Sequence, residues 1–362
     1  MKRTLALRIF ALCILTLYIL APLAARADDA PLLWKTSLRI FTTRFETYWP
    51  TPRAKEPQYL TTSWMPRFSF TVQGPLAGGS KITVQFTKPD GSAWLNLPCD
   101  TPEIAAGDTA KFVSPSEQTN DKRAIRETGV FGFTIKLTNE LTQTKAVLYS
   151  GKFNVSKFHI GSVEPKFKNV FEYFVEHDWM LPIGYLFVND TPDEEAPPVV
   201  AVMWFRGDMD TPNIAAYVFY KGKQVASTKT DGGISHPVDV GTPGMLPDPK
   251  WQRWHFSFSN IRSTNKMTSA NRYPDTMIFL DKNPGMYEIK VLRDGKLART
   301  ATFTVGADGK IVDNGLAQKN KLGTPWMMLP VKVMPGMDGK ANITNYRASA
   351  FYANPVVGFP DP

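Results

Sequence analysis

The stretch Gly129-Val130-Phe131-Gly132-Phe133-Thr134-Ile135-Lys136-Leu137 leads through a polar turn to Gly151-Lys152-Phe153-Asn154-Val155. The same plan returns in Gly285-Met286-Tyr287-Glu288-Ile289-Lys290-Val291, which leads through Arg293-Asp294-Gly295-Lys296 to Ala301-Thr302-Phe303-Thr304-Val305. In each copy an aromatic residue stands two positions after the glycine, apolar residues alternate after it, and the second segment ends in Phe-x-Val. Alternation of period two predicts β-strands. Each copy therefore predicts a β-hairpin, and the pair predicts two copies of one β domain.

The rest of the chain follows the same rhythm of short strands and turns. Pro89-Asp90-Gly91 and Lys221-Gly222-Lys223 are strong turn signals between alternating segments. Long helical patterns are missing, and strands at this spacing are typical of β-sandwiches. We expect an all-β protein with this division: signal peptide 1–27, N-terminal arm 28–60, β-sandwich domain 1 over 61–157, linker 158–178, β-sandwich domain 2 over 179–313, and C-terminal extension 314–362.

Four expectations concern the segments outside the repeated hairpins. Residues 28–60 are interpreted as an extended arm that packs on a domain face. Leu329–Val333 is interpreted as a strand added to a sheet edge, and residues 335–362 as a poorly ordered tail. Between Ala216 and Tyr220 both faces of the predicted strand are apolar. This pattern favours burial between the two domains or under the arm, and the alternative is an exposed stripe that marks an interaction site.

The end of the second copy resembles the last two strands of bacterial immunoglobulin-like or fibronectin-type-III-like modules. In those folds a tyrosine near the start of the penultimate strand caps the preceding corner through its hydroxyl. The resemblance therefore assigns a structural role to Tyr287, and Gly285 and Gly129 open the two hairpins. Phe131, the counterpart of Tyr287, has no hydroxyl. The resemblance implies two tandem immunoglobulin-like antiparallel β-sandwiches.

The N-terminus predicts export. Lys2, Arg3 and Arg8 precede an apolar run that ends near the small-residue pattern Ala25-Arg26-Ala27, which is typical of a cleaved signal peptide. Cleavage would make Asp28 the first residue and leave no transmembrane segment. We expect a periplasmic or secreted protein.

Charge and cysteine content narrow the function classes. Residues 1–27 hold four basic and no acidic residues, so the net charge of +9 becomes +5 after cleavage. No run of Lys and Arg forms, which excludes a nucleic-acid footprint. Cys99 is the only cysteine of the mature chain, so no internal disulfide is possible. A buried, inert thiol is expected, and the alternative is an intermolecular bridge.

Candidate binding residues come from aromatic and histidine side chains. His255 falls on the strand face opposite Trp254, and with Trp251 and Tyr220 it is a candidate for an exposed aromatic patch that binds a ligand. His177 and Asp178 are adjacent, so in a strand they would point to opposite faces and not act as an acid–base pair.

Few residues are candidates for metal ligands or for catalysis. Asp208 and Asp210 are weak candidates for a Ca²⁺ site in a loop, and no cofactor is expected. The chain lacks the Gly-x-Ser-x-Gly nucleophile elbow.

Three functional hypotheses remain open. The first is a non-enzymatic binding or scaffold protein of the cell envelope that acts through sheet faces or edges. The second is a protein that contacts or modifies polysaccharide through aromatic residues. The third is a hydrolase with two catalytic carboxylates.

Overall fold

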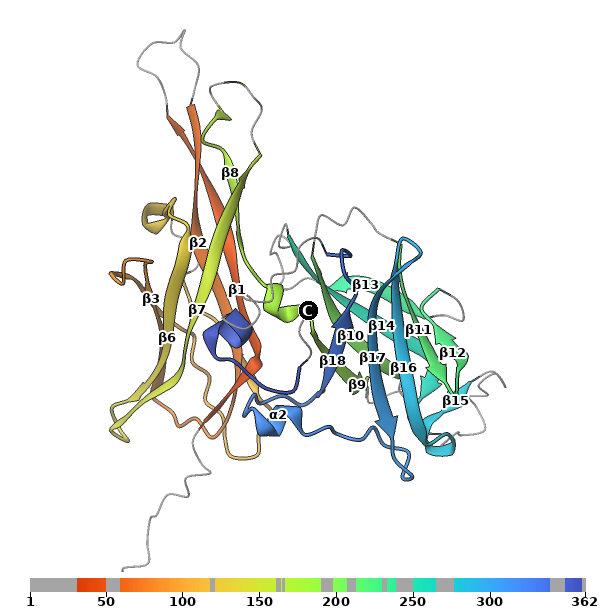
Figure 1. Ribbon diagram of the computed structural model, residues 1–362. Helices are drawn as coiled ribbons and strands as arrows, with labels where there is room; N and C mark the ends of the chain where they lie inside the picture. Colours follow the sequence, from red (N-terminus) through yellow and green to blue (C-terminus); the bar gives the residue numbers. More distant parts are fainter. Residues whose placement is uncertain are drawn as a thin grey trace, which may run out of the picture.

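The computed structural model describes residues 31–49, 59–117, 121–160, 164, 167–189, 198–206, 213–229, 233–238, 250–264, 277–338 and 349–359. These residues are predominantly β-strand, so the all-β prediction is confirmed. Figure 1 shows two β units side by side, an elongated first unit and a curled second unit. The predicted signal peptide lies outside the described residues.

The first unit consists of two sheets. One has the strand order β1-β2-β5, and the other has the order β4-β3-β6-β7-β8. Their bounds are β1 (Leu32–Trp49), β2 (Tyr59–Gln73), β3 (Ser80–Thr87), β4 (Ala93–Pro98), β5 (Lys111–Val113), β6 (Gly129–Asn139), β7 (Thr144–His159) and β8 (Phe171–Val175).

The second unit is a single sheet that curls towards closure. Its order is β12-β11-β16-β17-β18-β9-β10-β14-β13, with β15 beside β14. Its strands are β9 (Ile183–Val188), β10 (Pro198–Arg206), β11 (Ile214–Tyr220), β12 (Lys223–Ser227), β13 (Ile234–Val238), β14 (Trp251–Arg262), β15 (Ile278–Phe279), β16 (Gly285–Arg293), β17 (Lys296–Val305) and β18 (Met327–Val333). Ser235 Oγ on β13 donates to the carbonyl of Ile214 on β11 across the gap, at 2.8 Å.

Four short helices connect or follow these strands. The 3-10 helix η2 (Asp121–Arg123) precedes β6, η4 (Asp178–Met180) joins the two units, η5 (Leu280–Lys282) precedes β16, and α2 (Leu316–Lys319) precedes β18. A further helical turn spans residues 349–353.

The repeated hairpins have the same register. Gly129 pairs with Val155 and Phe131 with Phe153 in β6–β7, while Gly285 pairs with Val305 and Tyr287 with Phe303 in β16–β17. Both ladders shift register six residues after the glycine, between Ile135 and Lys136 and between Val291 and Leu292. The strands around them also follow one order, β4-β3-β6-β7-β8 in the first unit and β12-β11-β16-β17-β18 in the second.

The two units differ in whether their two halves are joined by a backbone ladder. In the second unit β18 pairs with β9 through a backbone ladder, from Met327 opposite Leu186 to Pro330 opposite Ile183. The corresponding strands of the first unit, β8 and β1, have no such ladder and belong to separate sheets. The expectation that the chain adds Leu329–Val333 to a sheet edge is therefore wrong, because β18 lies between β17 and β9 and makes the second sheet continuous.

The described residues form two apolar clusters, one inside the second unit and one that extends from the first unit into the space between the units. Alternate residues of β10 point to different sides. Val199, Ala201, Met203 and Phe205 fill the interior of the second unit, whereas Val200, Val202 and Trp204 join the core that extends from the first unit. The strands buried between the units thus include β10, together with β9 and β14. The prediction of this role for Ala216–Tyr220 on β11 is wrong, since Tyr217 and Phe219 are only half-buried.

The N- and C-terminal segments complete the first unit and the contact between units. The predicted arm forms β1, which pairs along its length with β2, and its residues Leu38 and Ile40 are fully buried. The expected tail contains Phe351 and Tyr352, each 1% exposed. Both segments are therefore part of the core, because their large apolar side chains fill the space between the units.

Candidate functional site

The sequence-predicted aromatic patch does not form. Trp251 is fully buried and packs edge-on against His177, with ring centroids 6.1 Å apart. Tyr220 lies at the far end of β11, where its hydroxyl donates to the carbonyl of Pro284 at 2.8 Å. The prediction of an exposed patch at Trp251 is wrong, since the first unit covers this face of the sheet.

Of the three predicted binding residues, His255 is the one that lies next to a pocket, because its ring neighbours Phe187 in the pocket wall. It is half-buried on β14, and its ring lies 6.4 Å from that of Phe187 on β9. Phe187 in turn stacks on Trp326, with centroids 4.9 Å apart and planes 19° from parallel. Both rings are half-buried.

Phe187 and Trp326 line a hollow of about 540 Å³ between β9 and the segment that leads into β18. Its walls also carry Asp313 and Thr324, and their other members are Leu186, Val188, Ile311, Ala317, Pro325 and Met327. Small-molecule sites commonly combine apolar walls with a few polar groups in this size range. The pocket offers aromatic surface beside one carboxylate and one hydroxyl.

Local hydrogen bonds fix the walls of this pocket. Thr324 Oγ1 accepts from the backbone N–H of Trp326 at 3.1 Å, and Asn314 Nδ2 donates to the carbonyl of Met328 at 2.6 Å. Asp313 Oδ1 accepts from the N–H of Gly315 at 3.0 Å. Trp326 is thus held against β9 before any ligand binds.

Sequence reasoning missed Phe187 and Trp326 as a pair. They are far apart in the chain, and only the pairing of β18 with β9 brings them together. The available signal was the apolar character of both faces of β9, on which Leu186 points inward and Phe187 outward.

His177 and Asp178 do not form an acid–base pair, as expected, but the reason differs. They lie at the junction of β8 and η4 and not within a strand. The His177 ring is surrounded by Phe41, Trp204, Trp251 and Tyr352. Burial, and then the positive charge of Arg39, lower the pKa of His177 to about 3. A neutral imidazole in this position supports packing and not proton transfer.

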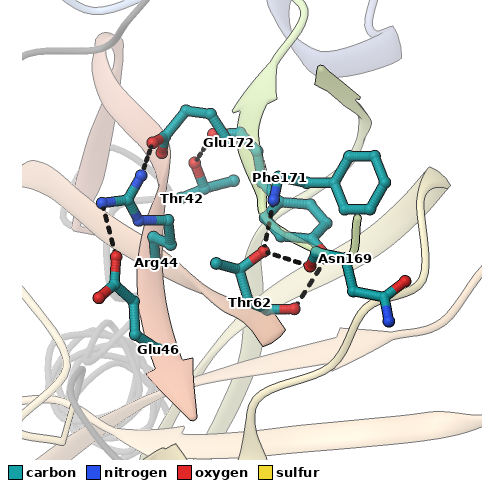
Figure 2. Close-up of polar contacts among 8 residues, drawn as sticks. Thr42, Arg44, Glu46, Thr62, Asn169, Phe171 and Glu172 are labelled. Atoms are coloured by element: carbon teal, nitrogen blue, oxygen red, sulfur yellow. Dashed lines mark hydrogen bonds and ion pairs between the residues drawn. The ribbon is translucent and has the colours of Figure 1, made fainter. Parts of the chain in front are cut away.

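A polar seam closes the first unit where its backbone ladder is missing, between β1, β2 and β8 (Figure 2). Arg44 on β1 contacts both Glu172 on β8 and Glu46 on its own strand, the latter at 3.0 Å. Thr42 Oγ1 donates to the carbonyl of Tyr173. Burial raises the pKa of Glu172 in spite of the neighbouring Arg44.

The second half of this seam uses β2. Thr62 Oγ1 accepts from the N–H of Phe171 at 2.7 Å, and the N–H of Thr62 donates to the carbonyl of Asn169 at 3.3 Å. Figure 2 shows these contacts converging from three strands. Their partners are within the protein, so the seam is a structural closure.

The structural candidates lie at the start of the first strand of each hairpin, β6 or β16. Tyr287 donates its hydroxyl to the carbonyl of Asn283 at 2.8 Å. Its ring stacks on Tyr220 and Phe303, with centroids 4.6 Å and 5.0 Å away. Gly129 and Gly285 have φ values of +120° and +133°, a region that favours glycine.

Metal and thiol chemistry find little support in the described part of the chain. Asp208 and Asp210 lie outside it. Within it, no group of three or more His, Cys, Asp and Glu side chains is arranged to hold a metal ion. Cys99 is half-buried, and burial raises the pKa of its thiol to about 12, so the reactive thiolate is disfavoured.

None of the helices that the structure describes has the length and apolar character needed to cross a membrane. Comparison of the chain with protein-family models, with curated proteins and with solved structures finds no match. The candidate site therefore depends on its geometry alone.

Proposed function

We propose that this chain is an exported, non-enzymatic binding protein of the cell envelope, and that the pocket of Phe187 and Trp326 binds carbohydrate. The observation that carries the proposal is the pair of stacked rings beside Asp313 and Thr324 in an open hollow. The apolar C–H face of a sugar ring packs on aromatic surface, while its hydroxyls need polar partners nearby. The pocket supplies both.

A binding role is favoured over hydrolysis by the number of acids at the pocket. Glycoside hydrolysis uses two carboxyl groups on opposite sides of the scissile bond. Asp313 is the single carboxylate among the described residues that line the hollow. We therefore do not assign catalysis to this site.

The domain plan of this proposal is two copies of one immunoglobulin-like β module. Its support is the shared register of the two hairpins and the shared order of the strands beside them. The first copy keeps two sheets, and the second has joined them through β18 and β9. Export is supported by the sequence of residues 1–27, and sequencing the N-terminus of the purified protein tests it: Asp28 is expected first, and Met1 would contradict export with cleavage.

Affinity electrophoresis in gels that contain envelope polysaccharides tests the carbohydrate proposal. We expect retardation of the native protein, and at least a tenfold weaker interaction for Trp326→Ala because half of the ring stack is lost. Asp313→Asn, which keeps the hydrogen bond to Gly315, provides a second variant that is expected to fold normally. Phe112→Ala removes a 52% exposed aromatic residue on β5 and is the matched control.

A second function is favoured by a different feature, the short edge strand β5. Among the described strands it pairs only with β2, and it exposes Phe112, so a protein partner could extend this sheet. If polysaccharide gels do not retard the native protein, the carbohydrate proposal is wrong. Capture of an envelope protein that Phe112→Ala abolishes would then support the scaffold role.

A further inference from the structure

Two arginines from different units meet where the first unit packs on the second. Arg39 on β1 is 9% exposed, and its guanidinium lies over the Trp204 ring at 5.6 Å. Trp204 is directly opposite Arg253 in the β10–β14 ladder. The charges of both arginines also act on the buried Tyr185, where they oppose the rise in its pKa that burial causes. Arg39, Arg253 and Tyr185 therefore form one cluster.

Neither arginine of this cluster has a counter-ion among the described residues. Arg39 Nη1 donates to the carbonyls of Thr36 and Leu38, at 2.8 and 2.9 Å, which are neutral acceptors. The Nε of Arg253 is buried and has no hydrogen-bond partner.

Two other arginines of the described chain lie beside carboxylates. Arg299, which is fully buried, contacts Asp338, and Arg206 lies 3.7 Å from Glu176 and 3.8 Å from Asp178. No ion pair of this kind is found for Arg39 or Arg253 among the described residues.

The lack of a counter-ion is energetically costly. A buried charge without a partner destabilises a fold strongly, and like charges that are close together add to the cost. Burial, and then the charge of Arg39, lower the pKa of Arg253 to about 9, so it stays protonated at neutral pH. A bound anion would offset both effects, and the planar guanidinium fork fits two oxygens of a carboxylate, sulfate or phosphate.

We propose that Arg39 and Arg253 form an anion-binding site at the junction of the two units, which takes a carboxylate, sulfate or phosphate group. The site stands independently of the carbohydrate pocket, but the two are neighbours. The ring of Tyr185 lies 5.7 Å from that of Trp326, which lines the pocket. The anion can thus be a free ion or the acidic substituent of a glycan.

Thermal unfolding at constant ionic strength tests the site. Protein purified from the full sequence is heated in chloride, with inorganic sulfate or phosphate, and with galacturonate as an acidic sugar. We expect millimolar oxyanion to raise the midpoint by a few degrees, because a ligand that binds only the folded state stabilises it. Stabilisation by the inorganic ions indicates a free anion, and stabilisation by galacturonate alone indicates a glycan substituent.

Arg253→Gln separates binding from general salt effects. Sulfate stabilises many proteins by exclusion from their surface, and this part of the response is expected to survive in the variant. The additional rise of the unfolding midpoint, which is due to anion binding, is expected to disappear in the variant. Its unfolding midpoint in chloride is expected to equal or exceed that of the native protein, since an uncompensated charge is gone. Lys296→Gln, at the exposed β16–β17 turn, is the control and keeps the native response.

An equal anion response in native protein and Arg253→Gln would overturn the site. If that variant does not fold, isothermal titration of the native protein decides: absence of binding heat with sulfate, phosphate and galacturonate also overturns it. Failure of this test leaves the carbohydrate proposal intact, because that proposal is measured at Trp326 and Asp313 with neutral as well as acidic polysaccharides.

Discussion

At the scale of single residues, the hydroxyl of Tyr287 contributes one hydrogen bond, while the packing of this side chain is due to its ring. Tyr287→Phe keeps the rings of Tyr220 and Phe303 stacked on it but leaves the carbonyl of Asn283 without its donor. We expect a loss of about 1 kcal/mol in the free energy of unfolding, measured by urea denaturation. Tyr217→Phe on β11 is the control, since the described part of the structure shows no hydrogen bond for that hydroxyl. Equal midpoints for native protein and Tyr287→Phe would rule out the corner.

His177 predicts a dependence of stability on pH. Its pKa in the folded state is about 3, while an unfolded chain has the ordinary value near 6.5. Below pH 6.5 the unfolded chain therefore binds a proton that the folded protein does not, so stability is lost as the pH falls from about 6.5 towards 3. The slope from this group approaches about 1.4 kcal/mol per pH unit.

Denaturation at pH 7.5 and pH 5.5 measures this contribution. His177→Phe keeps an aromatic ring among Phe41, Trp204 and Trp251 but cannot be protonated. We expect the variant to lose less stability than native protein over this range. His159→Phe on β7 replaces an exposed histidine and is expected to keep the native slope. Identical slopes in native protein and His177→Phe would show that His177 is not buried as a neutral group.

At the scale of elements, the first glycine of each hairpin has the same backbone requirement, a positive φ. Gly129 and Gly285 both have a positive φ, so Gly129→Ala and Gly285→Ala force a side chain into a strained conformation. We expect each to cost about 1–3 kcal/mol, measured by chemical denaturation. Gly78→Ala is the control, because its new Cβ would meet only the mobile carboxylate of Glu103 at 3.4 Å. A cost at Gly285 with none at Gly129 would contradict the equivalence of the two hairpins.

The hairpins were predictable because their signals are local. The glycine, the alternation and the turn all lie within one continuous segment, and so do the turns at Pro89-Asp90-Gly91 and Lys221-Gly222-Lys223. The pairing of β18 with β9 was not predictable, since it joins strands far apart in the chain and its register depends on the whole sheet. The pocket of Phe187 and Trp326 depends on this pairing, so local sequence patterns could not indicate it. Strand alternation alone indicated Trp251 and Tyr220 as binding residues.

At the scale of the whole molecule, strands β10 and β14 are buried on both faces, and this identifies them as part of the contact between the two units. Trp251 looked like a surface ring because strand alternation predicts one polar and one apolar face. The first unit covers the second face of β10 and β14, so Trp204 and Trp251 are buried there with Arg39 and His177. Sequence periodicity separates two faces but cannot say that both are covered.

The C-terminal segment links the two units and yields the last prediction. Phe351 is 1% exposed, and its ring lies 5.0 Å from that of Trp179 in the connection between units. Its carbonyl accepts a hydrogen bond from Tyr149 on β7 of the first unit. Residues 351–353 have φ values of +46°, +59° and +65°, a left-handed turn that costs energy in non-glycine residues. Burial of the aromatic rings must outweigh that cost.

We expect Phe351→Ala to cost about 3–5 kcal/mol and to lower the midpoint of a single calorimetric transition shared by both units. Val357→Ala, at a position that is 56% exposed, is the control and is expected to change little. Two separate unfolding transitions in the native protein would contradict this coupling. They would mean that one unit unfolds while the other stays folded, although both units contribute to the apolar core around Trp204. A shared transition that Phe351→Ala does not move would instead show that the left-handed turn contributes no net stability.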